Sequence, residues 1–142
     1  YNFASINIRI IDLIYRFYNC MEKGLTFTAN IKVCNENSAR VMGSGDLDVF
    51  ATPAMVALME NAAMNAVAPA LPDGSTTVGA YIETSHVKPS GIGENVSAKA
   101  VLDEIDGRKL TFSITASDSK GIIGEAKHVR YIVGREKFMS KL

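Results

Sequence analysis

The sequence contains no tryptophan and has few of the residues that mark metalloproteins and disulfide-rich scaffolds. Its 142 residues include two cysteines, two histidines and four prolines. Cys20 and Cys34 form neither a CxxC pair nor a Cys/His ligand pattern, so the sequence predicts no metal site. One disulfide between them is formally possible, but two incidental thiols are more typical of a reduced, cytoplasmic protein.

The chain also lacks an excess of either charge. It has 15 basic and 15 acidic side chains, for a formal net charge of zero. A general nucleic-acid binder needs a basic excess to neutralise phosphates, so we expect no nucleic-acid partner. The balance still permits one local basic patch for a single phosphorylated ligand. The length favours one domain, and the hydrophobic fraction of 47% indicates a folded chain.

No hydrophobic run is long enough to predict a membrane span. Arg9, Asp12 and Arg16 interrupt the apolar N-terminal stretch, which also lacks the small-residue cleavage site of a secretory signal. This stretch is either sequence upstream of a natural start at Met21 or an added helix. We therefore divide the chain into an N-terminal extension, residues 1–22, and one domain, residues 23–142.

The domain begins with a predicted strand and then a helix. Residues 25–33 alternate between apolar and polar, as a half-buried strand does. Residues 35–48 predict a loop with a short strand around Val41. Thr52 is suited to cap a helix that starts with Pro53, and the run to residue 68 is apolar on nearly every side. Such a helix is buried.

Four further strands are predicted after the helix, separated by short turns such as Asp106–Gly107. They cover residues 76–88, 96–103, 110–117 and 122–133. A meander of this kind forms an antiparallel sheet with an apolar face, and one helix is available to cover it. The element order favours an α+β fold with a curved sheet around a buried helix, although other α+β folds share it.

Three side chains stand out chemically. Glu60 is the only formal charge between Asp48 and Asp73, and a carboxylate in apolar surroundings is costly unless it is paired. It either has a special partner or lies on a solvent-facing stripe with asparagines. His86 lies in a predicted strand, where histidine is more often structural than catalytic. His128 shares a strand face with Arg130. The pair either binds an anion such as a CoA phosphate or forms the polar face of an edge strand.

Longer motifs resemble a known family. Residues 48–60 read DVFATPAMVALME, residues 78–86 read VGAYIETSH, and residues 124–130 read GEAKHVR. Together they resemble the fluoroacetyl-CoA thioesterase family among the hotdog thioesterases, over about residues 25–138. The resemblance implies the hotdog fold, a homodimer, and hydrolysis of a small acyl-CoA without a cofactor, since CoA is part of the substrate. In the loop before Phe50 the chain lacks the family's longer aromatic stretch, so selectivity for fluoroacetate is not implied.

The resemblance also assigns the site. Catalytic roles fall on Thr52, Glu60 and His86, with Glu60 acting either as a base for water or as a nucleophile. Substrate-binding positions are Phe50, Gly79, His128 and Arg130.

Helix geometry adds a constraint on this assignment. Eight residues of helix separate the Cα atoms of Thr52 and Glu60 by about 12 Å. We therefore expect an active site at the dimer interface, with Thr52 and Glu60 supplied by different subunits. The competing hypotheses are a non-catalytic acyl-CoA-binding module, a hotdog hydratase and a structural domain.

Overall fold

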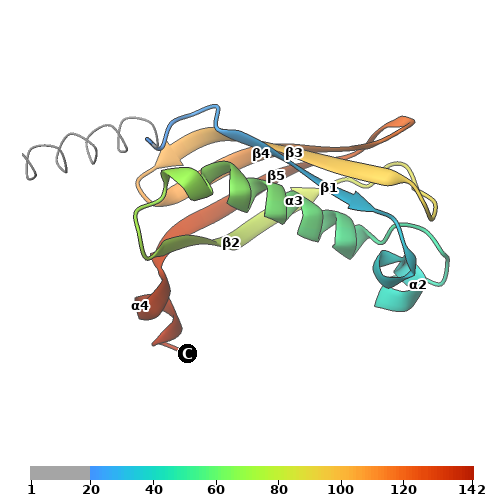
Figure 1. Cartoon of the computed structure of the whole chain (residues 1–142), viewed down its shortest axis with the longest axis horizontal. Helices are drawn as coiled ribbons and strands as arrows, with labels where there is room; N and C mark the ends of the chain where they lie inside the picture. Colours follow the sequence, from blue (N-terminus) through green and yellow to red (C-terminus); the bar gives the residue numbers. More distant parts are fainter. Residues whose placement is uncertain (1–19) are drawn as a thin grey trace, which may run out of the picture.

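In the computed structural model, which describes residues 20–142, one antiparallel sheet curves around a long helix (Figure 1). Most of the predicted extension, residues 1–22, lies outside the described residues. The strands are β1 (Thr26–Lys32), β2 (Ser75–Thr84), β3 (Asn95–Asp106), β4 (Lys109–Asp118) and β5 (Gly121–Gly134). The helices are α2 (Ala39–Met42), α3 (Thr52–Val67) and α4 (Arg135–Met139), with short 3₁₀ turns at Asn35–Asn37 and Ala68–Ala70.

The five strands follow the order β1-β3-β4-β5-β2, and every neighbouring pair is antiparallel. The predicted antiparallel sheet is confirmed, but the meander covers only β3, β4 and β5, because β2 pairs with β5 and not with β3. β1 and β2 form the two edges of the sheet. Alternation places one face of each strand on the core, as on β4, where Leu110, Phe112, Ile114 and Ala116 are all buried. The residues between them face away from the helix.

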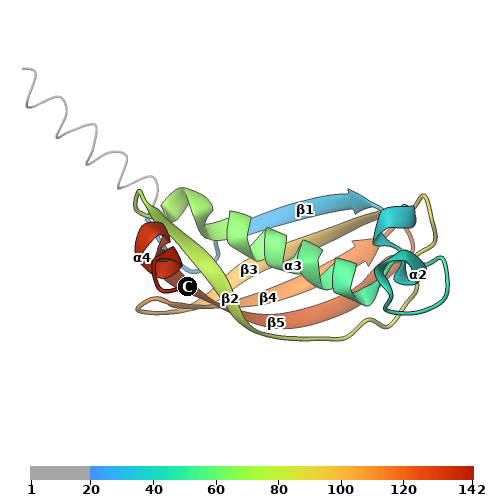
Figure 2. The same cartoon turned by 90° about the horizontal axis from the view of Figure 1, so that it is seen from below.

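Helix α3 fills the concave side of the sheet. Met55, Met59, Ala62 and Ala63 are completely buried, and the helix packs chiefly against β1 and β3. Small alanine side chains let the helix lie close to the strands, while the flexible methionines fill the remaining gaps. Figure 2 shows α3 lying across the sheet, with α2 at its N-terminal end and α4 near the opposite end. The predicted hotdog architecture is confirmed.

Two local predictions were wrong, and one helix was missed. The segment around Val41 is the short helix α2, whose N-cap is Ser38 and whose last turn is closed by Gly43 in the left-handed conformation. The N-cap of α3 is Ala51 and makes no side-chain cap, so Thr52 is the first helical residue instead. Helix α4 continues the chain after β5 and was not predicted.

A β-bulge in β2 controls which side chains face the helix. Gly79 pairs with Arg130, but Tyr81 pairs with Val129, so Ala80 is an extra residue in the strand. Before the bulge, Thr77 and Gly79 face the helix, and after it Ile82 packs against the core. The bulge therefore ends one inward row at Gly79, beside the middle of α3.

Two expectations from composition can be compared with this fold. Cys20 and Cys34 are both free thiols, as expected of incidental cysteines. Between residues 20 and 142, the chain forms no helix with the length and hydropathy that crossing a membrane requires.

Candidate functional site

The N-terminal end of α3 brings Thr52 to His86. The Thr52 Oγ1 lies 2.8 Å from Nδ1 of His86, which belongs to the segment after β2. Because Ala51 rather than Thr52 caps the helix, the Thr52 hydroxyl is free to make this bond. The pair opens on a cavity of about 280 Å³ at the same end of the molecule. The predicted substrate-binding residue Phe50, itself buried, is part of its wall.

His86 is tuned by its surroundings. Burial lowers the pKa of His86 below its ordinary value of 6.5, so the ring is neutral at neutral pH. A neutral imidazole has one nitrogen that donates and one that accepts. Nδ1 is occupied by Thr52, whereas Nε2 is buried and has no hydrogen-bond partner within the described chain. Buried polar atoms rarely stay unpaired, so Nε2 is the ring atom that still needs a hydrogen-bond partner.

Further along α3, Glu60 faces β5 and β2. Its Oε2 lies 3.3 Å from Nη1 of Arg130 and 3.8 Å from Nε2 of His128. The Glu60 side chain retains 40% of its exposure, whereas the Arg130 side chain retains 7%. The sequence left open whether Glu60 has a specific partner or faces solvent, and both are true. Arg130 contacts one side of the carboxylate, and the other side is exposed.

Arg130 is fixed by a residue that the sequence analysis did not select. Thr77 accepts from Nε through its hydroxyl and from Nη2 through its backbone carbonyl, both at 2.9 Å. These two bonds leave Nη1 aimed at Glu60. Thr77 could have been found from the sequence, because it is two residues before Gly79 and so shares its strand face.

The contacts of His128 require its neutral form. Nδ1 lies 2.6 Å from the carbonyl oxygen of Tyr81, and Nε2 lies 3.2 Å from Nη1 of Arg130. A carbonyl needs a donor and a guanidinium needs an acceptor, so the proton is on Nδ1. Burial, aided by the charge of Arg130, lowers the pKa of His128 in agreement with this tautomer. His128 thus supports the Arg130 side chain and is not a cation beside Glu60.

The burial of His128 and Arg130 excludes one of the two readings of their strand. They are 1% and 6% exposed and lie on the inner face of β5, so neither is on the polar face of an edge strand. The anion that Arg130 contacts within the chain is the Glu60 carboxylate. The prediction that the two residues share one strand face was correct. The sequence did not determine whether that face meets the helix or solvent.

Gly79 completes the surroundings of Glu60. A Cβ atom at this position would lie 2.5 Å from Oε2 of Glu60 and 3.3 Å from Cε1 of His128. The carboxylate therefore occupies the space that any other residue at position 79 would fill. Glycine is required here for close approach, not for an unusual backbone conformation.

We expect Gly79→Ala to lower kcat/KM of the enzyme proposed below by roughly tenfold to a hundredfold, because a methyl group would push the Glu60 carboxylate out of position. Gly91→Ala is the matched control, since a Cβ there meets no atom within 4 Å. Thioester hydrolysis and thermal unfolding of both variants would be measured. Unchanged activity in Gly79→Ala would show that the carboxylate position is unimportant.

The structure thus gathers the predicted residues into two clusters. Thr52, His86 and Phe50 form one, and Glu60, Gly79, His128 and Arg130 form the other. They lie about 12 Å apart along α3, by the rise of the helix. Within one subunit, no bond described above joins them. Among residues 20–142 no group of His, Cys, Asp and Glu side chains could hold a metal ion.

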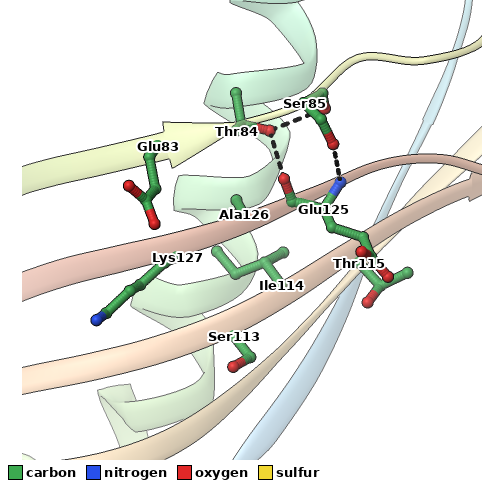
Figure 3. A pocket seen from close by; sticks show the side chains of 9 residues that line it. All are labelled: Glu83, Thr84, Ser85, Ser113, Ile114, Thr115, Glu125, Ala126 and Lys127. Carbon is green, nitrogen blue, oxygen red and sulfur yellow. Dashed lines mark hydrogen bonds between the residues drawn. The ribbon is translucent and has the colours of Figure 1, made fainter.

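The largest hollow among those described lies elsewhere and lacks these groups. It measures about 590 Å³ and lies on the sheet face away from α3, beside the end of β2 and the interior of β4 and β5 (Figure 3). Its polar side chains include Glu83, Ser113 and Lys127. None of the predicted site residues lines it, and it contains no histidine. We therefore assign the chemistry to the two clusters on α3.

Comparisons with known proteins identify the family. A family model described as fluoroacetyl-CoA-specific thioesterase matches residues 33–136. The fluoroacetyl-CoA thioesterase of Streptantibioticus cattleyicolor is 37% identical over 95 residues, which make up 67% of this chain and 68% of that protein. A solved structure of a fluoroacetyl-CoA thioesterase has a TM-score of 0.79 at 32% identity, covering 85% of this chain and 94% of the other. A thioesterase-superfamily member from Thermus thermophilus has a TM-score of 0.78 at 24% identity, covering 84% and 89%.

Proposed function

The chain belongs to the fluoroacetyl-CoA-specific thioesterase family, and on that premise we propose that it hydrolyses a small acyl-CoA to the free acid and CoA. The observation that carries the proposal is the Glu60 carboxylate, which is held by Arg130 on one side and exposed on the other. A protein that only binds acyl-CoA has no need of a carboxylate in the middle of an apolar helix. Water is the only co-reactant, so the reaction needs no cofactor.

Each catalytic group has a task that its surroundings suit. Glu60 either removes a proton from water or attacks the thioester carbonyl, and both routes end in the same acid. Backbone amides near Gly79 donate hydrogen bonds to the oxyanion that forms, and the Thr52 hydroxyl donates to Nδ1 of His86, which keeps the proton of the neutral ring on Nε2. Nε2–H of neutral His86 donates a hydrogen bond that stabilises the departing thiolate of CoA, and solvent supplies the proton that the thiolate takes up. The carbon–sulfur bond breaks as the new carbon–oxygen bond is completed.

The two clusters meet if two subunits pair through β2 and α3. β2 is an edge strand whose outer side has no partner among residues 20–142. It contains no lysine or proline, the residues that commonly prevent an edge strand from pairing with another chain. The uncovered face of α3 presents Pro53, Ala57 and Met64, which are exposed and apolar. An antiparallel homodimer would cover both surfaces and place Thr52 and His86 of one subunit beside Glu60 of the other. The active site would then lie at the interface.

The size of the acyl group follows from the cavity beside Thr52. At about 280 Å³ it suits a short acyl chain, and α2 lies against it through Ala39. The aromatic stretch that the family has before Phe50 is absent here, so we propose a small acyl group and not fluoroacetate in particular. We place the enzyme in the cytoplasm, where CoA thioesters are used and free thiols such as Cys20 and Cys34 persist.

The experiment that tests this proposal is thiol release from a panel of acyl-CoAs of increasing chain length. We expect hydrolysis to be fastest for the short acyl groups and to fall as the chain outgrows the cavity. Calorimetric binding of the same panel would be measured in parallel. Binding without any release of thiol would reject hydrolysis and leave an acyl-CoA-binding module.

A further inference from the structure

Helix α4 and the turn between β3 and β4 enclose a pocket that the proposed chemistry does not use. It measures about 210 Å³ and lies at the end of β5. Its walls are Arg108, Val133, Gly134, Lys137, Phe138 and Lys141. The structure holds α4 there through the backbone, because the amide of Arg135 donates to the carbonyl of Gly74. Figures 1 and 2 both show α4 at one end of the sheet.

The pocket combines three cations with one aromatic ring. Arg108, Lys137 and Lys141 are exposed, and none of them lies within ion-pair distance of a carboxylate in residues 20–142. Phe138 is 37% exposed and lines the same pocket. Since the chain as a whole has no net charge, three cations without a carboxylate in the wall make a local site for an anion.

The position of this pocket relative to Glu60 matches the length of one part of the substrate. Arg130, which contacts Glu60, and Gly134, from which α4 starts, belong to the same strand. Four residues of extended strand cover about 14 Å. The pantetheine arm of CoA, which joins the thioester to the nucleotide, has a comparable reach.

We propose that this pocket, defined by Arg108, Lys137, Phe138 and Lys141, binds the phosphorylated adenosine end of CoA in the subunit that contributes Glu60. The proposal rests on the proposed function and adds a subsite to it. The three cations bind the phosphates, and Phe138 stacks on the adenine. The subsite therefore contributes to substrate binding and not to the chemical step.

The test compares two thioesters that carry the same short acyl group, one on CoA and one on pantetheine, which lacks the nucleotide. In the double variant Lys137→Glu/Lys141→Glu, we expect KM for the CoA thioester to rise about tenfold with kcat unchanged. The pantetheine thioester should be hydrolysed as by wild type. Lys32→Glu/Lys99→Glu, exposed lysines on β1 and β3, changes the net charge equally and should affect neither substrate.

Phe138→Ala separates stacking from charge. It should raise KM for the CoA thioester a few-fold, again without changing the pantetheine thioester. Added salt should raise KM for the CoA thioester more in wild type than in the double variant, because screening acts on the phosphate contacts.

Three results would overturn the subsite. They are equal KM changes for both thioesters, no change for either, or a wild-type enzyme that does not distinguish CoA from pantetheine. In each case hydrolysis of the pantetheine thioester would still support the proposed function. If wild type hydrolyses neither thioester, the proposed function fails. Titration with adenosine 3′,5′-bisphosphate then tests whether the pocket binds the nucleotide. Binding that Lys137→Glu/Lys141→Glu weakens would support the subsite, and no binding would reject it.

Discussion

Replacing Glu60 with Gln is expected to lower kcat for acyl-CoA hydrolysis by about a thousandfold, within the range for loss of a general base. Glutamine keeps the shape of the side chain but neither accepts a proton from water nor attacks a thioester. KM should change little, because Glu60 acts on the reacting carbonyl and not on the rest of CoA. Single-substrate kinetics on the best acyl-CoA of the panel would measure both constants.

Two further variants separate this effect from damage to the fold. Glu60→Gln leaves the Arg130 guanidinium, which is 7% exposed, without its carboxylate, so some loss of thermal stability is expected. Glu60→Asp keeps the charge but shortens the side chain, and should be more stable than Glu60→Gln while still losing most of the activity. Glu104→Gln, at an exposed position on β3, should change neither property. A Glu60→Gln enzyme with more than a tenth of wild-type kcat would exclude Glu60 from the chemistry.

The sequence was sufficient to predict the fold because each element has a clear period. The apolar run after Pro53 predicts a buried helix, and the alternating strands after it predict a sheet for that helix to cover. The family resemblance then selects the hotdog fold among the α+β folds that share this order. The extra residue at Ala80 was not predictable, since a bulge depends on pairing between β2 and β5. Helix α2 was missed because four residues carry too little periodicity to separate a helix from a strand.

The site was predicted less completely, for a physical reason. Threonine is a common N-cap residue, so local propensity favoured a cap at Thr52. In the structure its hydroxyl instead forms a hydrogen bond with His86, which lies 34 residues later. The period of β5 places His128 and Arg130 on one face, but cannot say whether that face meets the helix or solvent. The Glu60–Arg130 pair spans 70 residues and depends on the register of β5 beside α3. Such long-range pairs come from the fold and not from any local pattern.

The most consequential claim is that the two clusters act together only across a subunit interface. A subunit carrying Thr52→Val keeps a functional Glu60, and a subunit carrying Glu60→Gln keeps a functional Thr52–His86 pair. Each variant alone should be nearly inactive, because both sites of its homodimer lack one group. In a mixed dimer, one site receives both substitutions and the other receives none.

Measuring thiol release by that mixed dimer tests the claim most directly. The two variants would be produced together with different affinity tags, and the dimer carrying both tags would be purified. The composite site predicts about half of wild-type kcat, from one intact site in two, with unchanged KM. A mixed dimer as inactive as its parents would show that Thr52 and Glu60 act within one subunit, and a fully active wild-type monomer would contradict the interface itself.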